Sequence, residues 1–97
     1  MTIGEKLRRI RDKAKYEIDD KLNSLVKKVY PILEGAAKSC ADCCEIDDAE
    51  VFEAWKKLAD ENELEVHDWC VMNELEVEIN YEEKKLAFSW NEIYVEI

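Results

Sequence analysis

The feature that most constrains this chain is an apolar pattern with steps of three and four residues near its start. The pattern comprises Ile3, Leu7, Ile10, Ala14, Ile18, Leu22, Leu25, Val26 and Val29. Such spacing puts the apolar side chains on one face of an α-helix and leaves the other faces to charged residues. Thr2, followed three residues later by Glu5, forms a capping box at the start. We therefore predict a long amphipathic helix, which at ~1.5 Å per residue is roughly 40 Å long.

A proline interrupts this pattern without ending it. Pro31 disfavours a helical conformation for the residue before it. The apolar phase nevertheless continues through Ile32, Leu33, Ala36 and Ala37. We expect a kink near Pro31 and a short second helical piece that ends near Lys38.

A further helix is predicted at about 48–61. Asp47 or Asp48 can cap its start, and Asn62 suits its end. Its buried face would consist of Val51, Phe52, Trp55, Leu58 and Ala59. The preceding segment, 39–45, is either a loop or a brief strand.

The remainder of the chain has the pattern of β-strands. The segment 74–81 alternates polar and apolar residues without a fault, and 86–90 and 93–97 do so after short turns. We expect a further strand from Leu64 to about Val71. The chain is thus predicted to be a single α+β domain, 1–97, with a C-terminal antiparallel β-meander of three to four strands. One face of that sheet would lie under helices, and the other would be rich in glutamate.

Charge divides the chain into two parts. Residues 1–38, the basic helical arm, contain ten Lys and Arg against six acids, whereas residues 39–97 contain four against eighteen. A sheet of four strands is only about 15–20 Å wide, so the first helix must extend beyond it. We expect this overhang to form a homo-oligomer interface through Ile3, Leu7, Ile10, Ala14 and Ile18.

The acidic part suggests a surface that binds a basic partner protein. Two aromatic residues, Trp69 and Tyr94, fall out of phase with the apolar faces of their expected strands, and exposed aromatics often anchor contacts. The predicted partner-binding residues are Glu65, Trp69, Glu74, Glu76, Glu78, Tyr94 and Glu96. Acid–base catalysis requires paired carboxylates in a cleft, which an open sheet face does not supply, so we expect no enzyme activity.

A zinc site is an alternative, because soft ligands occur in two pairs. Cys40 and Cys43 form one pair, and His67 and Cys70 form the other. Against zinc, residues three apart on a strand point to opposite faces, and neither pair is followed by a glycine. Cys44 and Cys70 also suit a core as small apolar residues. A redox role for Cys40 and Cys43 is not expected, because the pair follows a helix and precedes a loop.

The first alternative, ahead of a zinc-stabilised structural module, is an oligomeric protein that sequesters a small ligand such as a nucleotide signal. The basic groups for such a pocket would come from Arg8, Arg9, Arg11 and Lys15 of neighbouring subunits. Nucleic-acid binding is not expected, because acidic residues interrupt the basic ones and no aromatic rows accompany them.

The location expected from the sequence is the cytoplasm. No window approaches the ~20 apolar residues of a membrane span. The N-terminal residues are charged from the start and lack a signal-peptide core. The cysteines are therefore expected to be reduced, and no membrane partner is expected.

The arrangement of the chain resembles small accessory proteins of tailed bacteriophages. The resemblance includes Ala36-Ala37-Lys38, an Asp-capped helix that ends near Asn62, and strands that reach Phe88-Ser89-Trp90. It implies a phage origin and an inhibitor of a host defence protein, present in the host cytoplasm and acting on a basic host surface. It carries no residue-level motif from which a site could be transferred.

Overall fold

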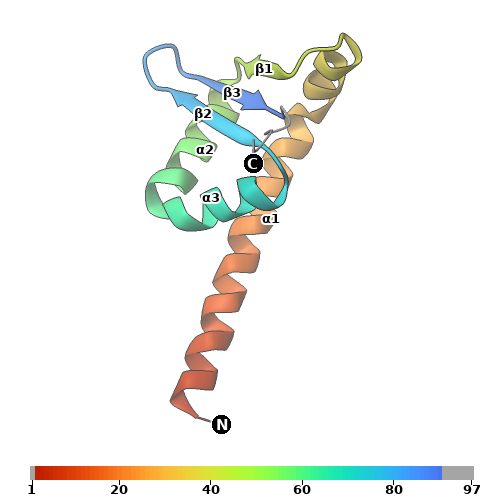
Figure 1. The fold of residues 1–97 in the computed structure, drawn as a ribbon. Helices are drawn as coiled ribbons and strands as arrows, with labels where there is room; N and C mark the ends of the chain where they lie inside the picture. Colours follow the sequence, from red (N-terminus) through yellow and green to blue (C-terminus); the bar gives the residue numbers. More distant parts are fainter. Residues whose placement is uncertain (1, 91–97) are drawn as a thin grey trace, which may run out of the picture.

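The computed structural model describes residues 2–90. Along these residues it has three helices and three strands, and the predicted α+β class is confirmed (Figure 1). The elements are α1 (Ile3–Lys38), β1 (Cys43–Ile46), α2 (Ala49–Glu61), α3 (Glu63–Met72), β2 (Glu76–Asn80) and β3 (Lys85–Ser89).

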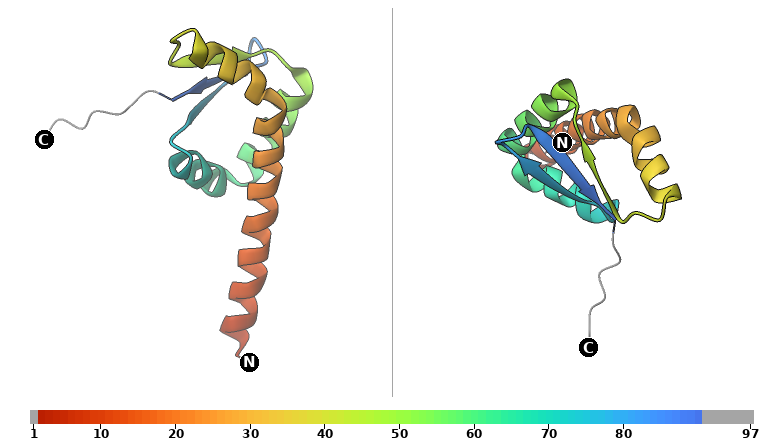
Figure 2. Two further views of the ribbon diagram at one scale, coloured as in Figure 1. Left: turned by 90° about the vertical axis from the view of Figure 1, so that its right-hand side faces the viewer. Right: turned by 90° about the horizontal axis from the view of Figure 1, so that it is seen from above.

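Helix α1 begins as predicted and continues through the proline. The Thr2 hydroxyl accepts a hydrogen bond from the Glu5 amide at 3.2 Å, which satisfies one of the free N–H groups of the first turn. Pro31 lies inside the helix, where it cannot donate to the carbonyl four residues earlier. The helix axis changes direction in the last turns of α1 (Figure 2). The expected kink is thus confirmed, but α1 remains one helix and no separate second piece follows.

The three strands form one antiparallel sheet in the order β1-β3-β2. β2 and β3 form a hairpin, and β1 pairs with the other edge of β3. The segment left open between loop and strand therefore supplies an edge strand. The order is not that of a simple meander, because α2, α3 and β2 separate β1 from β3 in the chain. The strand expected at 93–97 lies outside the described residues.

The core lies between the sheet and the helices. The inner face of the sheet contributes Ile46, Leu86 and Phe88, all at most 1% exposed. The Trp55 ring meets the Phe88 ring at 5.5 Å and the Trp69 ring at 5.8 Å, both edge to face. α1 contributes Leu22, Leu25, Val29 and Leu33. All four of these buried residues lie in the C-terminal half of α1.

The strand expected from Leu64 to Val71 was wrong, because this segment is helix α3. Its alternation is convincing for only three residues, and His67 and Asp68 then break it. Glu63 and Glu65 lie in the first turn of α3, where the helix dipole favours negative charge. The helical conformation also turns Val66 and Trp69 together into the core, which one face of a strand could not do.

The first half of α1 extends away from the rest of the molecule (Figure 1). Residues 3–17, which we call the arm, are all exposed. The predicted overhang is therefore confirmed. Among residues 2–90, no helix has both the length and the apolar content needed to cross a membrane.

Candidate functional site

On the outer face of the sheet, acidic side chains stand on both sides of a central strand that has a small side chain between them. Ala87 of β3 lies in register between Glu45 of β1 and Glu78 of β2. Both glutamates are exposed, and Ala87 is half-buried. Since adjacent strands are ~4.8 Å apart, the two glutamate backbones stand about 10 Å apart across a methyl group. The result is a trough with a small floor and a carboxylate on each side.

One lysine lies at the end of this trough. Lys85 Nζ is 3.9 Å from a Glu45 carboxylate oxygen and 3.7 Å from one of Glu83. Exposed pairs at such distances contribute at most about 1 kcal/mol. These two ion pairs are weak enough for a cationic side chain of a partner to replace Lys85 beside the carboxylates.

A cleft of about 430 Å³ continues from the trough to the β2–β3 turn. The Asn80 carboxamide oxygen accepts hydrogen bonds from the amides of Glu82 and Glu83 at 3.1 and 3.0 Å, and so fixes this turn. The Tyr81 ring is 55% exposed, and Lys56 Nζ lies 5.8 Å from its centroid. An aromatic surface therefore adjoins the acidic trough.

Of the predicted partner-binding residues within 2–90, only two lie on this face. Glu76 and Glu78 project outward from β2, as the alternation predicted. Glu74 lies in the preceding turn with φ 53, and Glu65 belongs to α3. Tyr94 and Glu96 lie outside the described residues.

Trp69 is not the exposed anchor that we expected. It is only 6% exposed, and its indole N–H donates to the Asn23 side-chain oxygen of α1 at 3.0 Å. The expectation assumed a strand, and the helical conformation instead turns this side chain inward. Trp69 therefore joins α1 to α3 as part of the core.

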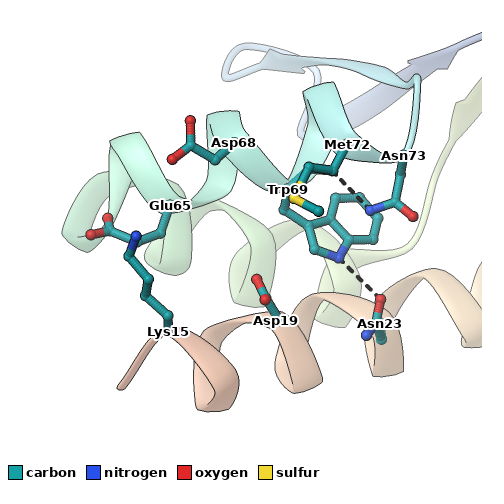
Figure 3. A pocket seen from close by; sticks show the side chains of 8 residues that line it. All are labelled: Lys15, Asp19, Asn23, Glu65, Asp68, Trp69, Met72 and Asn73. Carbon is teal, nitrogen blue, oxygen red and sulfur yellow. Dashed lines mark hydrogen bonds between the residues drawn. The ribbon is translucent and has the colours of Figure 1, made fainter. Parts of the chain in front are cut away.

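A second cleft, of about 310 Å³, lies between α1 and α3 (Figure 3). Lys15 and Asp19 line it from α1, and Glu65, Asp68 and Met72 line it from α3. Figure 3 shows Lys15 and Glu65 toward one end of this cleft and Trp69 with its hydrogen bonds at the other. Three carboxylates against one ammonium make this cleft acidic.

The predicted oligomer residues divide between solvent and core. Ile3, Leu7 and Ile10 are 78%, 60% and 66% exposed, and Ala14 is exposed with them. Ile18 instead packs partly against the core. The apolar stripe of the arm thus continues directly into the buried stripe of the same helix.

The predicted zinc ligands do not form a cluster. Cys40, Cys43 and His67 are exposed, and Cys70 is half-buried. Within the described part of the chain, no group of three or more His, Cys, Asp or Glu side chains is placed to hold a metal ion. Burial raises the pKa of the Cys70 thiol, which opposes formation of the thiolate that zinc requires. Zinc binding stays a prediction, and elemental analysis of protein purified without chelator tests it.

Sequence reasoning missed Glu45 and Ala87 as site residues. Glu45 fell in a segment predicted as either loop or strand, and nothing local indicated that it would lie beside β3. The alternation of 86–90 did place Ala87 on the outer face. Ala87 matters because it lies between Glu45 and Glu78, and only the register of the three strands shows this.

Comparison with known proteins adds no relative: no protein-family model, no curated protein and no solved structure matches this chain. The resemblance to phage accessory proteins thus stays an expectation from the residue pattern.

Proposed function

We propose that this chain is a non-enzymatic protein-interaction module that binds a basic surface of a partner protein through the outer face of its sheet. The observation that supports the proposal is the position of Ala87 between Glu45 and Glu78. A flat acidic face would attract cations in general, whereas a trough between two carboxylates suits one inserted side chain.

An arginine of the partner fits this trough best. Its planar guanidinium offers donors on several sides and pairs with carboxylates in a directed way. Over Ala87 it would meet Glu45 on one side and Glu78 on the other, and its stem would lie on the methyl group. Tyr81 beyond the cleft provides a further surface on which a guanidinium can stack.

The resemblance to phage proteins suggests a narrower form of this proposal. In that form the partner is a host defence protein, and the chain inhibits it by covering a basic surface that the host protein needs. The acidic trough supports the proposal that the bound surface of the partner is basic. The identity of the partner rests on the resemblance alone.

The alternative, sequestration of an anionic nucleotide, has less support. Each cleft has three carboxylates and one lysine among its lining residues, and this excess of negative charge repels phosphate. The basic residues that this alternative requires lie on the exposed arm. A thermal-shift screen against nucleotides tests it, since a bound ligand must raise the unfolding temperature.

The proposal is tested with a short arginine-rich peptide as the basic partner. In NMR spectra of the isotope-labelled protein, we expect the amide signals of Glu45, Ala87 and Glu78 to shift most. Affinity should fall steeply as salt is added, because screening weakens exposed charge contacts. Shifts confined to other parts of the molecule, or binding indifferent to salt, would refute the proposal.

Two substitutions sharpen this test. Ala87→Leu fills the trough without changing charge and should weaken peptide binding, whereas Ala37→Leu makes the same change at an exposed position of α1 and should not. Glu78→Lys should weaken binding more than Glu53→Lys on the exposed side of α2. Equal effects of the two leucine substitutions would mean that the peptide does not enter the trough, and equal effects of the two lysine substitutions would mean that it responds only to net charge.

A further inference from the structure

Helix α3 is apolar on two sides, but its own chain covers only one of them. Val66 and Trp69 face the core, whereas Leu64, Val71 and Met72 are 73%, 61% and 84% exposed. A helix with apolar residues all round is normally covered on all sides. We call this surface the outer face of α3: Leu64, Val71 and Met72 are its exposed apolar residues, and Glu65 and Asp68, which also line the cleft beside α1, form its acidic edge.

The arm has the same kind of uncovered surface with the opposite charge. Its stripe of Ile3, Leu7 and Ile10 is exposed. At ~100° per residue, Lys6 and Arg11 flank this stripe on its two sides. The arm thus presents apolar residues bordered by cations, and the outer face of α3 presents apolar residues bordered by carboxylates.

The cations that border the stripe of the arm, Lys6 and Arg11, form no ion pair with α3 of the same chain in the described residues. The stretch between Lys57 and Lys84 contains ten acids and no Lys or Arg. Among residues 2–90, the ion pairs are Arg11–Asp12, Lys38–Glu34, Lys85–Glu45 and Lys85–Glu83. None of these joins the arm to α3.

Geometry prevents the N-terminal part of the arm, with Ile3, Leu7 and Ile10, from reaching the α3 of its own chain. α3 lies beside α1 near Lys15, Asp19 and Asn23 (Figure 3). From there the arm runs straight on, away from α3, as part of one continuous helix (Figure 1). Only an arm from another copy can lie along the outer face of α3.

We propose that two copies of this chain form a reciprocal dimer in which the arm of each lies on the outer face of α3 of the other. Leu7 and Ile10 of one copy cover Met72 and Leu64 of its partner, and Lys6 and Arg11 meet Glu65 and Asp68. A two-fold axis makes the contact twice, so each arm need bury only about half of the ~800 Å² per partner that stable complexes typically bury. Direct pairing of two arms is disfavoured, because residues 6–15 contain six basic residues and one acid.

This dimer does not depend on the proposed function. The outer face of the sheet and the outer face of α3 are different surfaces, so either proposal can fail alone.

The test measures the mass of the whole protein in solution and exchanges charges across the contact. The wild type should sediment at about twice 11.4 kDa. Lys6→Glu with Arg11→Glu in one chain, and Glu65→Lys with Asp68→Lys in another, should each raise the dimer dissociation constant at least ~10-fold. An equimolar mixture of these two variants should dimerise again, because each arm then meets an α3 of opposite charge.

A matched control variant distinguishes this contact from a general effect of charge on the arm. Arg8→Glu with Arg9→Glu makes the same charge change on the opposite side of the arm and should leave the dimer intact. A wild type that stays monomeric would overturn the proposal. So would a dimer insensitive to Glu65→Lys and Asp68→Lys, which would indicate arm–arm pairing, and so would a mixture that fails to dimerise.

Discussion

The Asn23 side-chain oxygen accepts a hydrogen bond from the indole N–H of Trp69 at 3.0 Å, across the boundary between α1 and α3. Trp69 also packs edge to face against Trp55 of α2. One side chain therefore joins all three helices, and it does so at the level where the arm leaves the core. The bond is partly buried and Trp69 is only 6% exposed, so replacing Asn23 leaves the indole N–H without its partner where water has little access.

Asn23→Ala should therefore lower the free energy of unfolding by about 1–2 kcal/mol. Trp69→Phe removes the other partner, and the double variant should show a coupling of about 0.5–1.5 kcal/mol. Urea unfolding of the four proteins measures the cycle. Ser24→Ala, at the next and exposed position of α1, is the control and should change little. Additive effects of the two substitutions would show that the bond does not stabilise the fold.

Two leucines on the same stripe of α1 should behave very differently. Leu22 is fully buried and Leu7 is 60% exposed. Leu22→Ala should lower the free energy of unfolding by about 2–5 kcal/mol. Leu7→Ala, measured at low protein concentration where the chain is monomeric, should change it by less than about 0.5 kcal/mol. Equal losses would mean that the arm is covered within a single copy, contrary to its exposure.

The start of α2 distinguishes two adjacent aspartates. Asp48 accepts a hydrogen bond from the Val51 amide at 3.1 Å, and it is the N-cap of the helix. Asp48→Ala should therefore lower the free energy of unfolding by about 1 kcal/mol. Asp47→Ala removes the same charge one residue earlier and should have a smaller effect in the same thermal or urea unfolding measurement. The reverse order would place the cap at Asp47.

The cysteines should differ in reactivity. Cys40 and Cys43 are exposed, whereas Cys70 is half-buried, and burial raises the pKa of the Cys70 thiol. Because only the thiolate reacts, iodoacetamide at pH 8 should modify Cys70 more slowly than Cys40 or Cys43, as read by peptide mass spectrometry. In denaturant the difference should disappear. A native Cys70 that reacts as fast as Cys43 would contradict its burial.

The raised pKa of the Cys70 thiol also predicts how the stability of the fold changes with pH. The folded state favours the neutral Cys70 thiol, so its contribution is complete below the thiol pKa of the unfolded chain, about 8.5. It is lost as pH rises through the raised folded value. Across that range the stability of Cys70→Ala should fall less with rising pH than that of the wild type.

Local patterns in the sequence sufficed for the elements that local interactions determine. Thr2 with Glu5 marked the start of α1, Asp47 or Asp48 marked that of α2, and strict alternation marked β2 and β3. The error at Leu64–Val71 arose because a segment with apolar residues on all sides has no clear period. Its conformation depends on packing Trp69 against α1 and α2, which is tertiary information.

The candidate site was predictable only in part for a related reason. The alternation of β2 correctly directed Glu76 and Glu78 outward. The trough, however, depends on the register that sets Ala87 between Glu45 and Glu78. No short stretch of sequence encodes the pairing of strands that lie far apart in the chain.

The strand order also determines when the sheet can be completed during folding. β2 and β3 adjoin through a tight turn and can pair early, whereas Cys43 finds Ser89 only across α2, α3 and the whole of β2. Closing so long a loop carries an entropic cost before any contact compensates it, so such pairings form slowly. β1 is therefore the last strand to join, and the trough beside it is among the last features of the molecule to form.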